Sequence, residues 1–202
     1  MLSGVDEIIA FWFVDAGDSP EALAQRNALW FGSGRDFDHE IRARFETTIE
    51  FATTGACDHW EKEPRGLLAL ILLFDQFTRN IHRGTREAFA HDEAALRLCR
   101  ESIERGLDRR LSPLERIFVY MPLQHVEDPG GQALSVKLTE ALLDECPAAQ
   151  REYFEASHRY AVDHHDVIAR FGRFPHRNAV LGRESTAEER EYLQGGGSRF
   201  GQ

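Results

Sequence analysis

The sequence has little cysteine and no arrangement of it that indicates a disulfide framework or a zinc site. Its three cysteines, Cys57, Cys99 and Cys146, are odd in number and far apart. Disulfide-rich domains and zinc knuckles need closely spaced cysteines in matching numbers, and the histidines also lack the tight spacing of zinc ligands. We therefore expect a protein of the reducing cytoplasm with neither a metal nor a cofactor.

Long hydrophobic runs and excess positive charge are also missing. The apolar run Ile8–Phe13 is short and has no basic residues before it, which excludes a signal peptide and a transmembrane helix. The formal net charge of −10 disfavours nucleic-acid binding and repels an anionic membrane surface. We expect no nucleic-acid partner and no membrane contact, while association of identical chains is compatible with the sequence.

Several catalytic signatures are absent as well. The sequence contains no nucleophile elbow, no Walker loop, no His-Glu-x-x-His and no dinucleotide fingerprint. These absences remove many enzyme classes, but they leave small-molecule hydrolases and lyases open.

What the sequence does have is helical periodicity. No stretch alternates with period two between hairpin turns, and no sequence repeat recurs at a fixed interval. The pattern predicts an all-α protein of roughly eight or nine antiparallel helices joined by short loops. We expect one domain over residues 1–194, followed by a mobile glycine-rich tail over residues 195–202.

Capping signals place the helix starts. Ser3 is expected to cap a first helix, with Asp6 at the capping-box position. Ser19, Ser112 and Thr186 are expected to cap later helices, the first two directly before a proline at the first helical position. A helix is also expected from about Ala88 to Arg105.

Two later features concern helix ends and loops. Pro122 is expected to bend or end its helix. The run Asp128-Pro129-Gly130-Gly131 reads as a turn, with helices following at about residues 132–145 and 149–170.

The most apolar helix is predicted from Pro64 to Ile81. Its hydrophobic residues nearly encircle the helix axis, so we expect it to lie at the centre of the core. Gly84 is expected to end it.

A first polar segment, residues 75–80, lies at the end of this apolar helix. Asp75 and Arg79 are four residues apart, as are Gln76 and Asn80. Buried polar groups need partners, so the pairs are either a helix-end ion pair with a loop-binding amide or part of a site.

A second segment, residues 122–128, contains His125 and Glu127. The pair could supply an acid/base couple or a ligand, or His125 could simply interact with the last carbonyls of a helix.

The third segment, residues 164–183, begins at His164 and bends at Gly172 and Pro175. It carries four arginines against one acid, Asp166. The arginines could bind a carboxylate or phosphate, or they could pair with acidic neighbours in this acidic chain. Its candidates besides His164 are Arg170, Arg173, His176, Arg177, Asn178 and Arg183.

From end to end the chain resembles the bacterial domain-of-unknown-function family 924. The motifs that carry the resemblance are Phe11-Trp12-Phe13, Trp30-Phe31, residues 72–84, residues 122–128, residues 170–178, and Arg183 with Ser185, Thr186, Glu188 and Glu189. The resemblance implies an all-helical fold similar to tetratricopeptide-like superhelices, but no activity. The chain departs from the family pattern at Thr78, where a proline is usual, at His82, where an aromatic is usual, and at Val126, where a serine is usual.

Three functions compete on these grounds. The favoured one is a binding module whose positively charged pocket takes a small anion or an acidic peptide. The second is a small-molecule enzyme, a hydrolase or lyase using His, Glu and Asp as acid/base groups, and the third is a purely structural or assembly role. The candidate ligand-binding residues are Asp75, Gln76, Arg79, Asn80, His125, Glu127, His164, Arg170, Arg173, His176, Arg177, Asn178 and Arg183.

Overall fold

The computed structural model describes residues 2–17, 19–32 and 34–200, and no residue in these ranges lies in a β-strand. The all-α prediction is therefore confirmed. The helices are α1 (Val5–Phe13), α2 (Pro20–Phe31), α3 (Arg35–Thr53), α4 (Pro64–Ile71), α5 (Thr78–Ile81), α6 (Asp92–Glu104), α7 (Pro113–His125), α8 (Pro129–Glu145), α9 (Arg151–Phe171), α10 (Asn178–Leu181) and α11 (Ala187–Gln194). The numbering runs past the predicted eight or nine because the expected central helix is divided between α4 and α5, and because the short α10 was not foreseen.

Three of the four predicted caps are present. Ser19 accepts a hydrogen bond from the Ala22 amide, and Ser112 and Thr186 each form a complete capping box. The prediction at Ser3 was wrong. α1 is capped by Gly4 without a side-chain bond, and the Ser3 amide instead donates to Thr48 Oγ1 at 3.0 Å. A tertiary contact with α3 therefore replaces the local cap.

Two boundaries also differ from expectation around α7 and α8. α7 continues through Pro122 to His125. α8 begins at Pro129, because Asp128 caps it by accepting from the Gly131 amide at 2.7 Å and proline is tolerated at the first helical position. The extra turn of α7 carries His125 into the interior.

A third boundary differs at α6. This helix begins at Asp92, and Ala88 lies in a short 3₁₀ turn, Arg86–Phe89, that precedes it.

The predicted central helix is continuous from Pro64 to Ile81, but its turn from Leu72 to Phe77 is π-helical. Both the amide and the hydroxyl of Thr78 donate to the Leu73 carbonyl, the hydroxyl at 2.9 Å. The wider turn buries polar as well as apolar residues, since Asp75 is 0 % exposed. π-Helical turns often occur at functional sites.

An aromatic cluster surrounds this central helix. Trp12 and Trp30 each pack edge-to-face on Phe118, with ring centroids 5.6 Å and 4.7 Å away, and they stack on each other at 5.7 Å. Both arrangements are favoured by aromatic quadrupoles. The carbonyl of Trp12 accepts from Trp30 Nε1 at 2.9 Å and from Arg26 Nε at 2.8 Å. The Phe-Trp-Phe and Trp-Phe motifs of the sequence are thus parts of one core.

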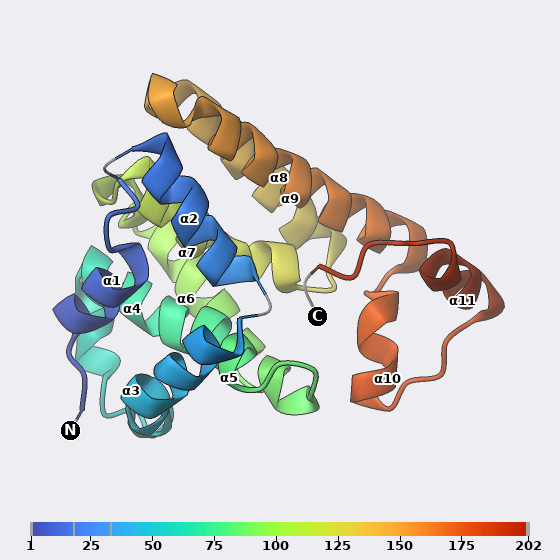
Figure 1. Ribbon diagram of the computed structural model, residues 1–202, viewed down its shortest axis with the longest axis horizontal. Helices are drawn as coiled ribbons and strands as arrows, with labels where there is room; N and C mark the ends of the chain where they lie inside the picture. The colour runs from blue at the N-terminus through green and yellow to red at the C-terminus, as the bar shows by residue number, and fades with distance from the viewer. Residues whose placement is uncertain (1, 18, 33, 201–202) are drawn as a thin grey trace.

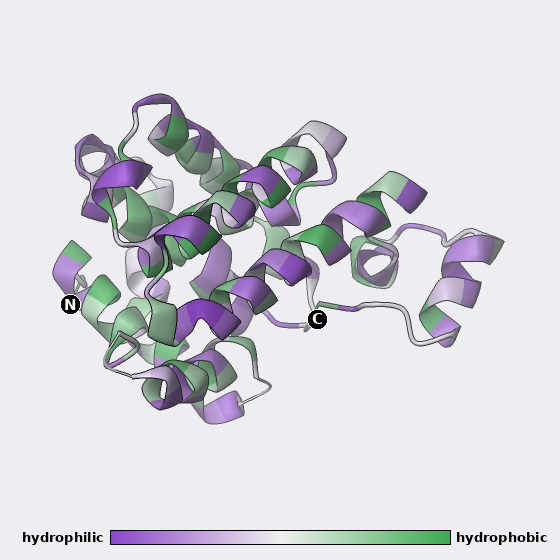
Figure 2. Cartoon of the chain, turned by 90° about the horizontal axis from the view of Figure 1, so that it is seen from above, coloured by the Kyte–Doolittle hydropathy of each residue, from purple (hydrophilic) through white to green (hydrophobic). Residues whose placement is uncertain are grey.

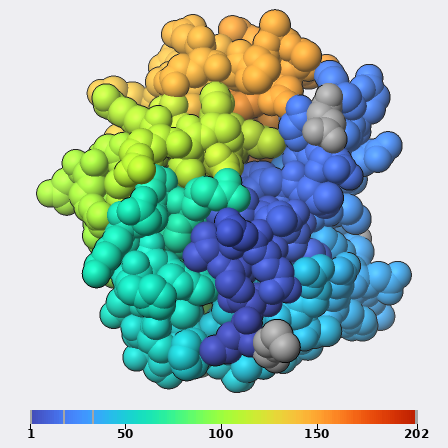
Figure 3. Space-filling view, turned by 90° about the vertical axis from the view of Figure 1, so that its left-hand side faces the viewer, coloured from blue at the N-terminus to red at the C-terminus, as the bar shows by residue number. Residues whose placement is uncertain are grey.

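The helices form a main body with an antiparallel pair, α8 and α9, across one side (Figure 1). Seen from above, α10 and α11 extend beyond that body (Figure 2). Figure 3 shows the face that lies away from α10 and α11, which is formed by the N-terminal helices and the segments that pack beside them. None of the described helices combines the length and apolar composition that crossing a bilayer requires.

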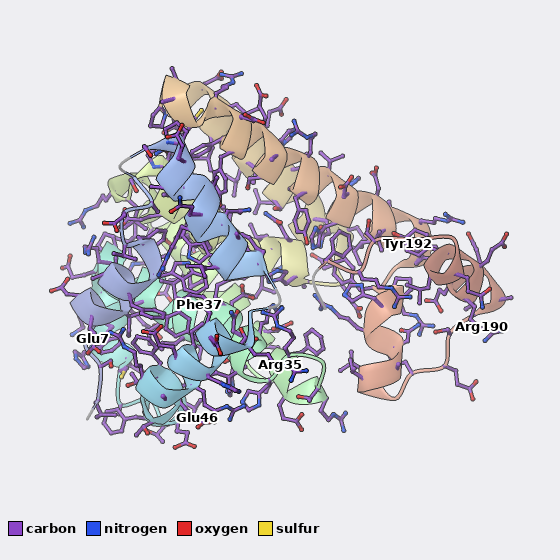
Figure 4. All side chains as sticks on the ribbon, in the orientation of Figure 1. Glu7, Arg35, Phe37, Glu46, Arg190 and Tyr192 are labelled. Atoms are coloured by element: carbon purple, nitrogen blue, oxygen red, sulfur yellow. The ribbon has the colours of Figure 1, made fainter. Side chains whose placement is uncertain are left out.

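Residues 172–200, which we call the C-terminal arm, have a small core of their own. Phe174 packs with Val167 and Ile168 of α9 in a cluster separate from the main one. Tyr192 of α11 adds a ring contact with Phe171 at 5.0 Å, and Figure 4 shows α11 on the far side of the molecule from Glu7. The apolar contacts of the arm are therefore made with the C-terminal end of α9.

Candidate functional site

A pocket of about 340 Å³ lies between the body, α9 and the C-terminal arm. Its wall has a polar end built on the central helix and an aromatic side built on α2, α9 and the tail. All three polar segments singled out in the sequence contribute lining residues to it. The lining residues are Asn27, Trp30, Phe31, Gln76, Arg79, Asn80, Arg83, Met121, Gln124, His125, Tyr153, Ala156, Ser157, Tyr160, His164, His176, Arg177 and Phe200.

Asp75 lies behind the polar end and orients His125. Its Oδ1 is 2.7 Å from His125 Nδ1 and 3.4 Å from Arg79 Nη2, and its Oδ2 accepts a hydrogen bond from Gln76 Nε2. Burial alone would raise the pKa of Asp75, but the interaction with His125, the positive charge of Arg79 and these hydrogen bonds outweigh it and lower the pKa. An ionised Asp75 accepts a hydrogen bond from the N–H at Nδ1 of His125, so the neutral imidazole carries its lone pair on Nε2.

His125 itself reaches the cavity. Its side chain is 16 % exposed, against 1 % for Asp75, and Nδ1 is occupied by the buried carboxylate. Because His125 also lines the pocket, Nε2 is the ring nitrogen that remains available to a ligand. Burial and then the charge of Arg79 lower the pKa of His125, so the ring is neutral at pH 7.

Arg79 is anchored rather than free. Its two terminal nitrogens bind Asp92 in a bidentate pair at 2.8 and 3.0 Å, and Nη1 also donates to the Ala88 carbonyl at 3.0 Å. Such fork-shaped pairs fix the guanidinium plane. Asn80, one residue along, donates to Asp38 at 3.0 Å.

Arg177 comes from the C-terminal arm and is 7 % exposed. Its guanidinium lies over the rings of Phe89 and Phe174, 4.8 and 4.4 Å from their centroids, and Nη1 donates to the His125 carbonyl at 2.9 Å. Its carboxylate contact, to Asp92, is long at 3.8 Å, and Nε has no partner among the described residues. Burial and then the charge of Arg79 lower the pKa of Arg177 to about 10, so the cation is present at neutral pH but poorly compensated.

Two more histidines complete the polar end. His164 Nδ1 is 2.7 Å from the Tyr160 carbonyl, and the ring stacks on Phe200 with centroids 3.6 Å apart. Burial and then the interaction with His125 lower the pKa of His164 well below its usual range.

His176 is held without hydrogen bonds. Neither of its ring nitrogens has a partner within the described part of the chain. Burial and then the charge of Arg177 lower the pKa of His176 to about 3. The three histidines of the pocket are therefore neutral at pH 7 and can act as donors or acceptors.

The pocket was expected to carry a net positive charge, but its arginines are paired with aspartates. Arg79, Arg83 and Arg177 line it, while none of the described lining residues is Asp or Glu. Asp75, Asp92 and Asp38 stand behind these arginines. The ion pairs thus turn their cationic ends toward the cavity, although their total charge is close to balanced.

Five predicted site residues do not line this pocket: Glu127, Arg170, Arg173, Asn178 and Arg183. Arg173 binds Glu189 through two bonds of 2.6 and 2.8 Å, and Arg170 binds Glu188 at 2.9 Å. Asn178 also donates to Glu189, at 3.2 Å. These residues fasten α11 to the bend, because the acids of its first turn lie within reach of the bend.

Glu127 and Arg183 form the remaining structural contact. Arg183 binds the two oxygens of Glu127 at 2.6 and 2.9 Å, and the Phe174 amide donates to Glu127 at 2.8 Å. The pair ties the α7–α8 loop to the C-terminal arm. It leaves Glu127 outside the cavity, so the expected acid/base role of Glu127 is not supported.

Sequence reasoning missed most of the aromatic side of the pocket. Tyr153, Ser157, Tyr160 and His164 recur every three or four residues along α9, and this helical stripe could have been noticed. Phe200 carried no such signal, because it lies in a segment read as a mobile tail. Residues 201 and 202 of that tail lie outside the described residues.

No group of three or more His, Cys, Asp or Glu side chains in the described ranges is arranged to hold a metal ion. Independence from zinc remains a prediction.

Comparison with known proteins fixes the family. Residues 8–197 match the family of bacterial proteins of unknown function DUF924. The chain is a member of DUF924. This DUF924 protein is also similar to a solved structure of a protein of unknown function, ATU0120 from Agrobacterium tumefaciens, with 34 % sequence identity and a TM-score of 0.79 over 95 % of this chain and 97 % of that one. No curated protein matches it.

Proposed function

We propose that this DUF924 protein binds a small organic molecule with a compact anionic group and an apolar body. The observation that carries the proposal is Arg177. A buried guanidinium whose carboxylate contact is 3.8 Å long and whose Nε lacks a partner among the described residues is a costly group to keep. An anion bound at its side would supply the missing compensation.

The shape of the pocket favours a small molecule over an acidic peptide. A volume of about 340 Å³ is within the range of small-ligand sites, roughly 300–1,000 Å³. The aromatic side, with Trp30, Tyr160 and Phe200, suits the apolar body of such a ligand, while the polar end provides donors for its head group.

The orientation of the ion pairs around the pocket also favours an anionic ligand. Balanced pairs have little effect at a distance, but at close range their nearer, cationic ends dominate. We therefore expect binding by contact in the pocket and little long-range steering in a protein of net charge −10.

A matched pair of probes tests the proposal. Calorimetric titration should detect phenylacetate and give at least about tenfold weaker binding for phenylacetamide, which has a similar shape but no charge, since a charge-assisted hydrogen bond is worth about 1.5–3 kcal/mol. Arg177→Gln should lose a similar factor. Arg170→Gln, which removes an exposed pair of the same arm, should bind like the wild type.

Two results would overturn the proposal: equal affinity for both probes, or an Arg177→Gln variant that folds and binds phenylacetate as well as the wild type does. Tight binding of an acidic peptide, without binding of either small probe, would show that the site binds an acidic peptide and not a small molecule.

A second candidate function, an enzyme acting on the bound anion, is favoured by one observation. The Asp75 carboxylate binds Nδ1 of His125, a residue of the pocket wall, and leaves the second ring nitrogen available to a ligand. A structural role alone does not need this arrangement at a pocket wall.

A further inference from the structure

The Asp75–His125 pair has the parts of a general base. Asp75 is fully buried and bonded to His125 Nδ1 at 2.7 Å, which sets the tautomer in which Nε2 accepts a proton. The imidazole lines the pocket and is 16 % exposed, so a ligand can touch it. We propose that the substrate is a 2-oxo acid with an apolar side chain. His125, positioned by Asp75, removes a proton from its C3, the carbon next to the ketone.

The substrate class follows from the neighbours of His125, and it rests on the proposed anion site at Arg177. Arg177 Nη1 donates to the backbone carbonyl of His125 itself at 2.9 Å. A carboxylate held by Arg177 therefore brings its own neighbouring atoms close to the imidazole. Proximity of this kind makes proton transfer effectively intramolecular.

A proton on a carbon next to a plain carboxylate is too weakly acidic for imidazole, whereas the proton at C3 of a 2-oxo acid is activated by the adjacent ketone. In the forward step His125 Nε2 forms an N–H bond, the C3–H bond breaks, and its electron pair becomes the C2–C3 double bond while the ketone π pair moves to O2. The reverse step returns a proton from His125 to C3. The cycle consumes no second reactant and leaves the base as it was.

A donor for the developing enolate oxygen lies just beneath the same wall. Gln124 lines the pocket and is 2 % exposed, and its Nε2 is buried without a partner among the described residues, so a turn of the side chain would present it to a bound ligand. Hydrogen-bond donors set in place before the reaction stabilise charge that develops at oxygen. The aromatic side of the pocket, including Trp30 and Phe200, can take the substrate's side chain.

The probe is 2-oxo-3-phenylpropanoate in deuterated buffer, with loss of its C3 proton signals followed by NMR. Wild-type protein should accelerate exchange about 100-fold over buffer alone, within the usual range for general base catalysis. His125→Gln should fall to the buffer rate while still binding the probe in calorimetry. Arg97→Gln, an exposed surface variant, should exchange like the wild type.

Chemical rescue separates catalysis from a structural effect. His125→Ala leaves space for an imidazole molecule, so added imidazole should restore exchange in this variant beyond its effect on the wild type and on buffer. Asp75→Asn should exchange more slowly even where its melting curve shows a folded protein, because the amide no longer fixes the tautomer.

The pH profile gives an independent readout. His125 is faced by Asp75 and Arg79 of the central helix, His164 of α9, and Arg177 of the arm. Because the pKa of His125 is lowered by burial and by Arg79, exchange should rise with pH to a plateau whose midpoint lies below the free-histidine value of about 6.5.

The possible failures are distinguishable. If the probe binds to the wild type but exchanges no faster than in buffer, the general base is wrong and the anion site stands. Exchange that persists in His125→Gln would overturn the assignment to His125. If the probe does not bind at all, both proposals fall for this class of acid.

Discussion

At the scale of single residues, similar side chains have unlike fates in this protein. Arg173 and Arg177 are four positions apart, yet Arg173 is neutralised by Glu189 at 2.6 Å while Arg177 is buried with a 3.8 Å carboxylate contact. The first contact fastens a helix and the second leaves a cation at a cavity. A charge count along the sequence cannot separate these roles, because it gives both residues the same value.

Glu189 gives a pH prediction at this scale. The hydrogen bond from Arg173, followed by the Thr186 amide and the Arg173 charge, lowers its pKa from 4.5 to about 2 against the opposing effect of burial. A depressed carboxyl pKa stabilises the fold above pH 4.5, and this contribution is lost as the pH falls toward 2.

Glu189→Gln should therefore lower the free energy of unfolding by about 1–3 kcal/mol at pH 7 and flatten its decline between pH 4.5 and 2. Urea unfolding at several pH values measures both effects. Glu188→Gln, whose partner Arg170 is exposed, serves as the control with a loss below about 1 kcal/mol. A Glu189→Gln protein with the wild-type acid profile would contradict the prediction.

At the scale of elements, the central helix does two tasks. Its apolar residues fill the core, and its π-helical turn carries Asp75 and Gln76 to the pocket. The Thr78 hydroxyl and amide both satisfy the Leu73 carbonyl, which supports the wide turn. One helix thus links core packing directly to the geometry of the site.

Because the central helix fills the core, shortening its buried leucine side chains should strongly lower the free energy of unfolding. Leu70 and Leu72 are 2 % and 0 % exposed, and removing most of a buried leucine side chain leaves a cavity. Leu72→Ala and Leu70→Ala should each cost about 2–5 kcal/mol in chemical denaturation. Leu29→Ala, at a position 43 % exposed, should change the free energy of unfolding by less than about 0.5 kcal/mol. Losses under about 1 kcal/mol at both buried sites would show that the helix is not central.

At the scale of the whole molecule, the pocket lies at a junction between two unequal cores. The main cluster contains the helices of the body, whereas the arm has Val167, Ile168 and Phe174 with a few partly buried neighbours. The arm nevertheless contributes Arg177 and Phe200 to the pocket. Ligand contacts would therefore bridge the more stable and the less stable part of the fold.

Native-state hydrogen exchange should reveal this difference. Amides of residues 174–194 should open at a lower free energy than those of α4 and α7, because they are supported by a smaller apolar cluster and by partly exposed ion pairs. Phenylacetate at saturation should slow exchange in the arm most, since it would contact residues on both sides of the junction. Equal opening free energies in the arm and the body would contradict this division.

The sequence alone was a good guide wherever the cause was local. The period of apolar residues, the capping boxes at Ser112 and Thr186, and proline at first helical positions predicted helices that the structure contains. The sequence misled at Ser3, where a contact 45 residues away takes the place of a cap, and about the end of α7, which continues past Pro122 to His125. In each failure a tertiary or helix-wide effect outweighed a local preference.

By itself, then, the sequence determined the helical class, the central helix and the polar segments from which the site is built, because helix formation and burial of an apolar face depend on neighbours within a few turns. Only the tertiary structure decided which arginines face a cavity, that Asp75 orients His125, and that Phe200 closes against His164. Those contacts join residues 36 to 52 positions apart. In a chain with 34 acidic residues, every arginine has many carboxylates as eligible partners, and only the folded path of the backbone brings one of them within reach.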